Sequence, residues 1–303
     1  MACHPGSLAA LEAKRCGGSG FPLVVLAAAL FLPPIALAQG GEKDLDTPYV
    51  PTPEAVVKRM LELADVKAGE TVIDLGSGDG RLVITAALKY GAHGFGVDLD
   101  PRLVERSNDA AARAGVADRV KFLQQDLFDT DFRQADVLTL YLLPDVNLAL
   151  RPKILADLKP GTRVVSHDYD MREWRPDAQE TIPAPGKTVG LHKESAVYLW
   201  IVPAKVAGRW ELEIDAGGKR QRVSLELKQQ YQMLSGTVGV SGGGRAPISD
   251  GKLRGNELRM TLPGGIVGEE PLELVGRIAG DDLSGSARRE GREIAIWSAR
   301  QRR

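Results

Sequence analysis

The stretch Thr71-Val-Ile-Asp-Leu-Gly-Ser-Gly-Asp-Gly-Arg-Leu-Val-Ile84 decides the fold of this chain. Four of its first five residues are apolar or β-branched, the exception being Asp74, and Thr71–Leu75 predicts a strand. A glycine-rich turn follows over Gly76–Gly80, and Arg81–Tyr90 then predicts a helix that Gly91 closes. Because glycine has no Cβ, such a turn can bend sharply and bring its backbone close to a ligand. Open α/β sheets bind ligands at this position, beyond the carboxyl end of a strand.

Strands and helices are predicted to alternate on both sides of this stretch. A helix is predicted over residues 54–66, with Thr52 as a candidate N-cap and Pro53 at its first position. Downstream, the pattern predicts strands at 94–98, 120–124, 137–142 and 163–166, helices at 101–114 and 145–158, and a closing antiparallel pair at Thr188–His192 and Ala196–Val202. This alternation is typical of a parallel, doubly wound α/β sheet.

The character of the chain changes after Pro203. About eight short segments of alternating polarity follow, separated by turn signals such as Gly242-Gly243-Gly244 and Asp250-Gly251. A Leu-x-Gly-x unit recurs among them, starting at Leu234, Leu253, Leu274 and Leu283. Since glycines inside strands often mark bends, residues 205–303 are predicted to form a small all-β barrel or sandwich. Its interior either holds a small apolar ligand or is filled by its own side chains.

Carboxylates end three successive strands of the predicted sheet. Asp74 lies two residues before the first glycine of the turn, Asp98 ends the second strand and Asp126 follows the third. Asp98 can accept both ribose hydroxyls of a nucleotide, with Leu99 beside it. Asp126 can accept from an adenine amino group while Leu127 flanks the ring. Each aspartate alone could be a loop or capping residue, but three at this edge indicate a binding site.

The spacing of the turn distinguishes two cofactors. A dinucleotide-binding turn reads Gly-x-Gly-x-x-Gly, whereas here Gly80 follows Gly78 after a single residue. S-adenosylmethionine carries a cationic amino acid end instead of a pyrophosphate, so a carboxylate such as Asp74 is favourable near it. The turn Gly76-Ser77-Gly78-Asp79-Gly80 therefore favours S-adenosylmethionine over NAD, and the Asp79 side chain is expected to point to solvent.

Four pieces of the sequence together resemble a known family, the protein-lysine methyltransferases whose mitochondrial members modify inner-membrane proteins. These pieces are Pro48-Tyr-Val-Pro-Thr-Pro53, Asp74–Ile84, Asp126-Leu-Phe128 and Trp174-Arg-Pro-Asp177, within residues 47–200. The resemblance implies a compact, Rossmann-like class I methyltransferase sheet of seven strands. It also implies methyl transfer from S-adenosylmethionine to lysine amines of a protein substrate.

The resemblance further implies roles for single residues. By motif position Thr52 lies near the methionine moiety, and Gly76, Gly78 and Asp98 carry the cofactor. The sequence departs from the family in two ways, because those members tend to use glutamate where Asp98 stands and because a whole β domain follows.

Two residues are predicted to serve the methyl acceptor. Methyl transfer is an in-line displacement for which a protein mainly aligns the reactants and excludes water. Tyr141, after the fourth strand, is expected to orient the acceptor, and Asp168, after the fifth, to assist deprotonation of a lysine ammonium. The alternatives are a core aromatic with a bonded hydroxyl and a polar strand end.

A second hypothesis for the whole chain is an exported S-adenosylmethionine- or nucleoside-binding protein, or sensor, with an inactive methyltransferase fold. It is prompted by the N-terminus, because S-adenosylmethionine is made in the cytoplasm. The intact glycines and the three aspartates favour an active enzyme.

The first 38 residues predict a signal peptide. Lys14 and Arg15 precede the apolar stretch Phe21–Ile35, and Ala36-Leu37-Ala38 matches a cleavage pattern. The alternative is a membrane anchor over residues 21–38, which would be the chain's only membrane contact. Either interpretation exports the remainder, to the periplasm or another extracytoplasmic site. The predicted divisions are residues 1–38, a methyltransferase domain over 39–204 and the β domain over 205–303.

Composition limits the partners. The chain has 39 Lys and Arg residues against 40 Asp and Glu, a net charge of −1, so it lacks the basic footprint of a nucleic-acid-binding protein. Both cysteines, Cys3 and Cys16, lie in the segment that a signal peptidase would remove. The histidines beyond that segment lack metal-ligand spacing, so no metal is expected.

Overall fold

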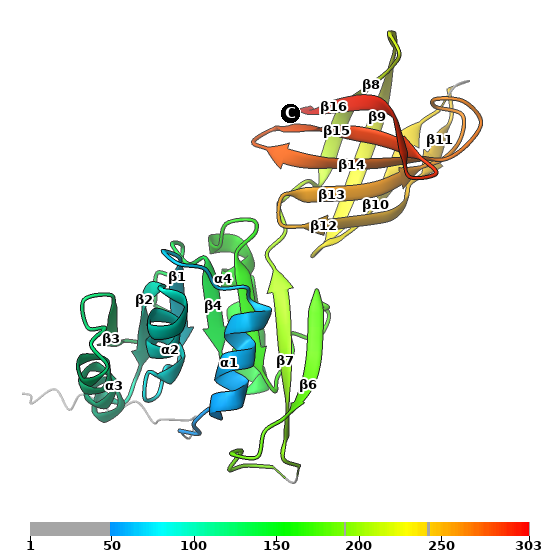
Figure 1. Cartoon of the computed structure of the whole chain (residues 1–303). Helices are drawn as coiled ribbons and strands as arrows, with labels where there is room; N and C mark the ends of the chain where they lie inside the picture. The colour runs from blue at the N-terminus through cyan, green and yellow to red at the C-terminus, as the bar shows by residue number, and fades with distance from the viewer. Residues whose placement is uncertain (1–48, 191, 241–242, 303) are drawn as a thin grey trace, which may run out of the picture. The chain divides into compact units, whose positions relative to one another are not determined.

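The computed structural model describes residues 49–190, 192–240 and 243–302, which form an α/β sheet and, later in the chain, an all-β barrel (Figure 1). The predicted signal peptide or anchor over residues 1–38 lies outside the described residues, as do both cysteines. Among the helices that are described, none is both long and apolar enough to cross a membrane.

Seven strands form the first sheet, in the order β3-β2-β1-β4-β5-β7-β6. The first five pair in parallel, while β7 runs antiparallel to both β5 and β6. The strands are β1 (Thr71–Leu75), β2 (His93–Asp98), β3 (Val120–Gln124), β4 (Val137–Leu140), β5 (Arg163–His167), β6 (Ala178–Pro183) and β7 (Glu194–Ile201). The predicted doubly wound, seven-stranded methyltransferase sheet is therefore confirmed.

Helices cover both faces of this sheet: α1 (Glu54–Leu63), α2 (Arg81–Tyr90), α3 (Pro101–Arg113) and α4 (Pro144–Asp157). One core joins α1 and α2 to alternate strand residues such as Val72 and Val137. A second core joins α4 to the strand residues between them, such as Ile73 and Leu138. Figure 1 shows α1 and α2 in front of the sheet and α4 behind it. The period of two along each strand thus produces a buried face on either side.

The edge strand β6 is where the sequence prediction was wrong. The closing pair was expected at Thr188–His192 and Ala196–Val202, whereas β6 spans Ala178–Pro183. Its residues alternate between half-buried and exposed, and apart from Ala178 and Ile182 they give little apolar signal. The described residues 188–190 instead lie in the loop before β7, with a bend at residues 189–190 where Gly190 has φ 86°. An edge strand needs only one covered face, so hydrophobic periodicity marks it poorly.

The β domain is a closed barrel. Neighbouring strands pair antiparallel from β12 through β16 and on to β8 and β9. Strand β10 closes the ring by pairing with both β9 and β12, and β11 pairs with β10. The strands are β8 (Gly208–Ala216), β9 (Lys219–Gln230), β10 (Met233–Gly239), β11 (Arg245–Pro247), β12 (Ser249–Arg254), β13 (Glu257–Leu262), β14 (Leu272–Ala279), β15 (Asp282–Arg289) and β16 (Arg292–Arg302). The barrel alternative to a sandwich is therefore the observed one.

Two glycines of the recurring Leu-x-Gly unit face each other inside the barrel wall. Gly276 on β14 pairs with Gly285 on β15. A Cβ on Gly276 would lie 2.4 Å from the Trp297 ring, and one on Gly285 would lie 2.0 Å from the Val275 carbonyl oxygen. The glycines thus let a large indole pack directly on the strand backbone.

The segment that joins β7 to β8 is tied to the barrel. The side-chain amide of Gln229 donates to the Ala204 carbonyl oxygen at 2.8 Å and accepts from the Val206 N–H at 2.8 Å. The Gln229 side chain on β9 therefore holds one carbonyl oxygen and one N–H of the connecting backbone.

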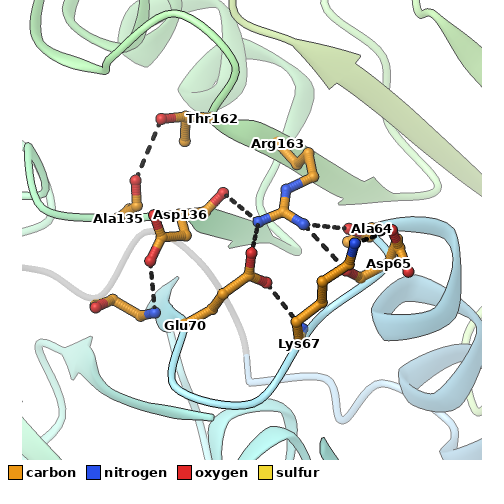
Figure 2. A network of polar contacts seen from close by, with 9 residues as sticks. Ala64, Asp65, Lys67, Glu70, Ala135, Asp136, Thr162 and Arg163 are labelled. Atoms are coloured by element: carbon orange, nitrogen blue, oxygen red, sulfur yellow. Dashed lines mark hydrogen bonds and ion pairs between the residues drawn. The ribbon is translucent and has the colours of Figure 1, made fainter.

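Arg163 braces the amino ends of three parallel strands, at the edge opposite the carboxyl ends (Figure 2). Its Nη2 lies 2.7 Å from the Glu70 carboxylate, just before β1, and 3.3 Å from the Asp136 carbonyl oxygen, just before β4. Its Nη1 donates to the carbonyl oxygens of Ala64 and Asp65, at the end of α1, both at 3.0 Å. One guanidinium therefore joins the sheet to carbonyls that a helix end leaves without intrahelical partners.

Candidate functional site

The predicted site residues gather at the carboxyl edge of the sheet, because five parallel strands end there. Asp74 is the next-to-last residue of β1 and pairs with Thr139 on β4, and Asp98 is the last residue of β2. Tyr141 comes directly after β4, and Asp168 directly after β5. The site is built around the glycine-rich turn after β1.

The turn needs its glycines for conformation and for space. Gly76, Gly78 and Gly80 all have positive φ, between 55° and 79°. A Cβ on Gly78 would lie 2.6 Å from the Tyr49 ring, and one on Gly80 would lie 2.6 Å from the Phe122 ring. Side chains other than hydrogen are therefore excluded at these positions on both grounds.

A further glycine, which the sequence analysis missed, lies under the turn. A Cβ on Gly96 of β2 would be 2.4 Å from the Ser77 Cβ. The N–H groups of Gly76 and Ser77 both donate to the Val97 carbonyl oxygen, at 2.9 and 2.8 Å. The turn therefore packs directly against the end of β2. The only sequence signal for the role of Gly96 was that it is the second glycine in a short strand.

Asp98 shapes the turn as well as facing it. Its Oδ2 accepts the Gly78 N–H at 2.9 Å, and its Oδ1 accepts the Asp100 N–H at 3.0 Å. A carboxylate has about four acceptor positions, so each oxygen retains one for a ribose hydroxyl. The adjacent Leu99 is half-buried. This arrangement fits the ribose of the expected cofactor.

Asp74 is buried beneath the turn. The Thr139 hydroxyl donates to its Oδ1 at 2.7 Å. Burial raises the pKa of Asp74 to about 7; the Thr139 hydrogen bond opposes that rise, and the neighbouring carboxylates of Asp98 and Asp79 add to it. Close by, the buried Ser77 hydroxyl has no hydrogen-bond partner within the described part of the chain. A buried carboxyl group and an unsatisfied hydroxyl are what a cationic, hydrogen-bonding ligand end would satisfy.

We expect the affinity for S-adenosylmethionine to fall as Asp74 takes up its proton. Only the carboxylate form attracts the cofactor's ammonium, so lowering the pH from 7.5 to 6 should weaken binding about eightfold. Calorimetric titration across this range measures the effect. Asp74→Asn should bind more weakly at pH 7.5 and should lose most of this dependence. An unchanged pH profile in Asp74→Asn would show that another group causes it.

Asp79 does not point to solvent, so that expectation was wrong. Its carboxylate is 13% exposed and forms a two-bond pair with Arg81, at 2.8 and 2.6 Å. The Tyr49 hydroxyl also bonds it, and burial together with the nearby charge raises the pKa of Tyr49. Arg81 donates in turn to the Thr52 carbonyl oxygen at 2.7 Å. These contacts fasten residues 49–52 across the turn.

Three aromatic rings lie together at the carboxyl ends of β4 and β5, where the acceptor residues were predicted. The centroid of the Tyr141 ring lies 3.9 Å from that of His167 and 6.4 Å from that of Tyr169. Burial, helped by the charge on Asp168, raises the pKa of Tyr141 to about 12, so its hydroxyl keeps its proton. Tyr169 is held by Asn147 of α4, whose amide donates to the Tyr169 carbonyl oxygen at 3.3 Å.

His167 connects the N-terminal segment to β7 through a buried imidazole. Its Nδ1 lies 3.3 Å from the Thr52 hydroxyl and its Nε2 lies 2.9 Å from the Ser195 hydroxyl. Burial lowers the pKa of His167 to about 4, so the ring is neutral at neutral pH. Thr52 and His167, which are 115 residues apart, therefore meet beside Tyr141.

The carboxylate of Asp168 is paired rather than free. Its Oδ2 lies 2.7 Å from the Lys187 ammonium and 3.4 Å from His167 Nε2, and its Oδ1 accepts the Ala196 N–H at 3.0 Å. Lys187, which lies in the loop between β6 and β7, was not predicted from the sequence. If Asp168 accepts a proton, it must therefore do so while its carboxylate is already paired with the Lys187 ammonium.

Two predicted residues, Asp126 and Leu127, lie just after β3, and Trp174 of the family-like segment is buried in the core. Asp126 accepts the Phe128 N–H at 2.9 Å, which closes the turn after β3. Leu127 packs on the same core as α4. Trp174 is buried, and Trp200 Nε1 donates to its carbonyl oxygen at 2.6 Å. Within the described residues there is no cluster of His, Cys, Asp or Glu that could hold a metal ion.

Known proteins match the part of the chain that contains this site. A family model described as the ANTKMT methyltransferase domain matches residues 74–178. A protein-lysine N-methyltransferase of Saccharolobus islandicus is 40% identical over 156 residues, which are 51% of this chain and 93% of that protein.

Two further relatives also match about half of the chain. An adenine nucleotide translocase lysine N-methyltransferase of Mus musculus is 34% identical over 44% of this chain; the match spans 58% of that relative's length. The crystal structure of an RNA methyltransferase from Salinibacter ruber, in complex with S-adenosyl-L-homocysteine, is 51% identical, with a TM-score of 0.47. The match covers 52% of this chain and 96% of the Salinibacter chain.

Proposed function

Because the chain belongs to the family of class I, S-adenosylmethionine-dependent methyltransferases that includes protein-lysine N-methyltransferases, we propose that it methylates the ε-amine of a protein lysine. The observation that carries this proposal is the juxtaposition of two features at one sheet edge. The glycine turn with Asp74 and Asp98 fits the cofactor. Thr52 links this turn to the rings, because its carbonyl oxygen accepts from Arg81 and its hydroxyl bonds His167, which packs on Tyr141.

In the proposed site the chain's own residues bind and orient the cofactor, which supplies a methyl group on a sulfonium. Asp98 would accept the ribose hydroxyls, beside Leu99, and Asp126 would accept from the adenine amine, beside Leu127. Asp74, Ser77 and the backbone of Gly76, Gly78 and Gly80 would surround the methionine end, with Thr52 across from them. Residues 49–52, held by Arg81, would keep water away from this end.

Tyr141 and Asp168 would serve the acceptor. The Tyr141 hydroxyl keeps its proton at neutral pH, so it can orient the amine as a hydrogen-bond partner. Asp168 would attract the lysine ammonium and assist the loss of its proton, which must precede attack because only the neutral amine has a lone pair. The hydroxyl and carboxylate act on alignment and protonation, while the displacement itself needs no strong base.

We expect Tyr141→Phe and Asp168→Asn to lower kcat/KM for a lysine peptide by about tenfold to a hundredfold. Affinity for S-adenosylmethionine should change by less than about twofold, since neither side chain is proposed to contact it. Steady-state kinetics and calorimetry measure the two effects. Asp145→Asn, at the exposed start of α4, is a matched control. Wild-type activity in both variants would remove Tyr141 and Asp168 from the acceptor site.

The inactive sensor is the less favoured alternative, since no glycine or aspartate of the cofactor site has been lost. It predicts binding of S-adenosylmethionine without methyl transfer. The same peptide assay therefore separates the two functions.

We also propose that the enzyme is exported, with residues 1–38 as its signal peptide, residues 39–204 as the methyltransferase domain and 205–303 as the β domain. The basic, apolar and small-residue pattern of the N-terminus supports export. The anchored form, held by residues 21–38, is the alternative. Cell fractionation with N-terminal sequencing of the chain tests both, and a cytoplasmic chain that retains residues 1–38 contradicts both.

For the β domain we propose a filled interior rather than a site for an apolar ligand. Buried side chains line the barrel, among them Trp210, Leu227 and Trp297. Indole and aliphatic side chains of this size support the proposal that the barrel interior is filled by its own residues.

A further inference from the structure

Lys187 is a largely buried cation that forms an ion pair with the Asp168 carboxylate. Its Nζ lies 2.7 Å from Asp168 Oδ2, and the two side chains are only 13% and 15% exposed. The same ammonium donates to the Glu194 carbonyl oxygen at 2.8 Å. Because lysine is almost never buried unless it is paired, these contacts are a built feature of the turn between β6 and β7.

The carboxylate that Lys187 occupies belongs to the acceptor end of the site. Asp168 follows His167 directly and has a positive φ of 61°, an uncommon conformation for a residue with a side chain. The Ala196 N–H holds it in this position. Lys187 therefore places a primary alkyl ammonium, the functional group of the proposed substrate, at the carboxylate proposed to receive that substrate.

We propose that Lys187 is a specificity-determining residue, whose ammonium neutralises Asp168 in the free enzyme and is replaced there by the ammonium of the substrate lysine. This inference rests on the proposed function. Exchange of one ammonium for another keeps the carboxylate paired while the substrate binds, up to the step in which the substrate ammonium loses its proton. A hydroxyl or amide acceptor would leave a charge unpaired at a largely buried position, which is costly. The pair would thus select cationic amines.

Two substitutions should move the KM for a lysine peptide in opposite directions. Lys187→Met removes the competing cation and should lower KM about tenfold, because the free site no longer has to release its own partner. Lys187→Arg keeps the charge and can pair more firmly with a carboxylate, so KM should rise about threefold. Lys159→Met, which removes an exposed lysine before β5, should leave KM unchanged. A purely structural role would instead impair both Lys187 variants.

A labelling measurement follows the exchange directly. The full-length enzyme with S-adenosylhomocysteine is pulsed with formaldehyde and a borane, and labelling of Lys187 relative to Lys159 is read by mass spectrometry. A peptide with one lysine should raise this ratio about fivefold, while the same peptide with alanine should not, since only an ammonium displaces Lys187.

An unchanged labelling ratio, or KM shifts of the same sign in Lys187→Met and Lys187→Arg, overturns the inference. If the wild-type enzyme methylates no lysine peptide, the proposed function fails, and the labelling ratio alone then decides whether Lys187 leaves Asp168.

Discussion

Asp98→Ala is expected to weaken S-adenosylmethionine binding about a hundredfold. Hydrogen bonds to a charged group contribute about 1.5–3 kcal/mol each, and water recovers part of the loss when two of them are removed. The Asp98 carboxylate also holds the Gly78 N–H at 2.9 Å, so its removal loosens the turn that faces the cofactor. Calorimetric titration of the variant and the wild-type protein measures the change.

Three variants control this experiment. Asp98→Glu keeps both acceptor oxygens and should lose less than about tenfold. Asp79→Ala should also lose less than about tenfold, because Asp79 bonds Arg81 and Tyr49 rather than a ribose. Asp118→Ala, an exposed carboxylate away from the site, should bind normally. Equal losses at Asp98 and Asp79 would show that the ribose site is misplaced.

Arg163→Met should cost about 3 kcal/mol of folding stability. Its guanidinium is 17% exposed and its partner Glu70 23% exposed, so the substitution leaves a largely buried carboxylate without its ion-pair partner (Figure 2). It also frees the carbonyl oxygens of Ala64 and Asp65 at the end of α1. Urea unfolding of the full chain, followed by tryptophan fluorescence, measures the shift in midpoint.

Arg133→Met is the matched control, because its pair with Asp131 is 70% and 60% exposed, and an ion pair this open to solvent should leave the unfolding midpoint nearly unchanged. Under folding conditions, Arg163→Met should bind S-adenosylmethionine within about twofold of wild type, since the brace lies at the opposite edge of the sheet. A wild-type unfolding midpoint in Arg163→Met would mean that solvent or nearby groups replace the brace.

The methyltransferase sheet was predictable because its signals are local. Thr71–Leu75, the glycine turn and the helix after it follow directly in sequence, and the strand-end aspartates Asp74 and Asp98 could be placed once the sheet was assumed parallel. The edge strand β6 was misplaced because its pattern carries few apolar residues. Burial on two faces leaves a strong mark in the sequence, whereas a half-covered edge leaves a weak one.

The contacts of the site were harder to predict because they join distant segments. Thr52 meets His167 across 115 residues, and Arg81 reaches back 29 residues to the Thr52 carbonyl oxygen. Lys187 gave no signal beyond being a lysine in a turn, and its pair with Asp168 exists only once β7 lies beside β5. Residue type indicated which groups carry chemistry, while the tertiary pairing decided which of them are free.

The central claim is methyl transfer from S-adenosylmethionine to a protein lysine. The direct measurement is mass spectrometry of cell-envelope protein and total RNA after incubation with the purified chain and methyl-labelled S-adenosylmethionine, with Asp98→Ala as the weakly binding reference. Label is expected on Nε-methyllysine, with one S-adenosylhomocysteine formed per methyl group transferred, and both products should fall strongly in the variant when S-adenosylmethionine is kept well below the variant's Kd. Label confined to RNA, or binding of S-adenosylmethionine with no transfer to any acceptor, would contradict it.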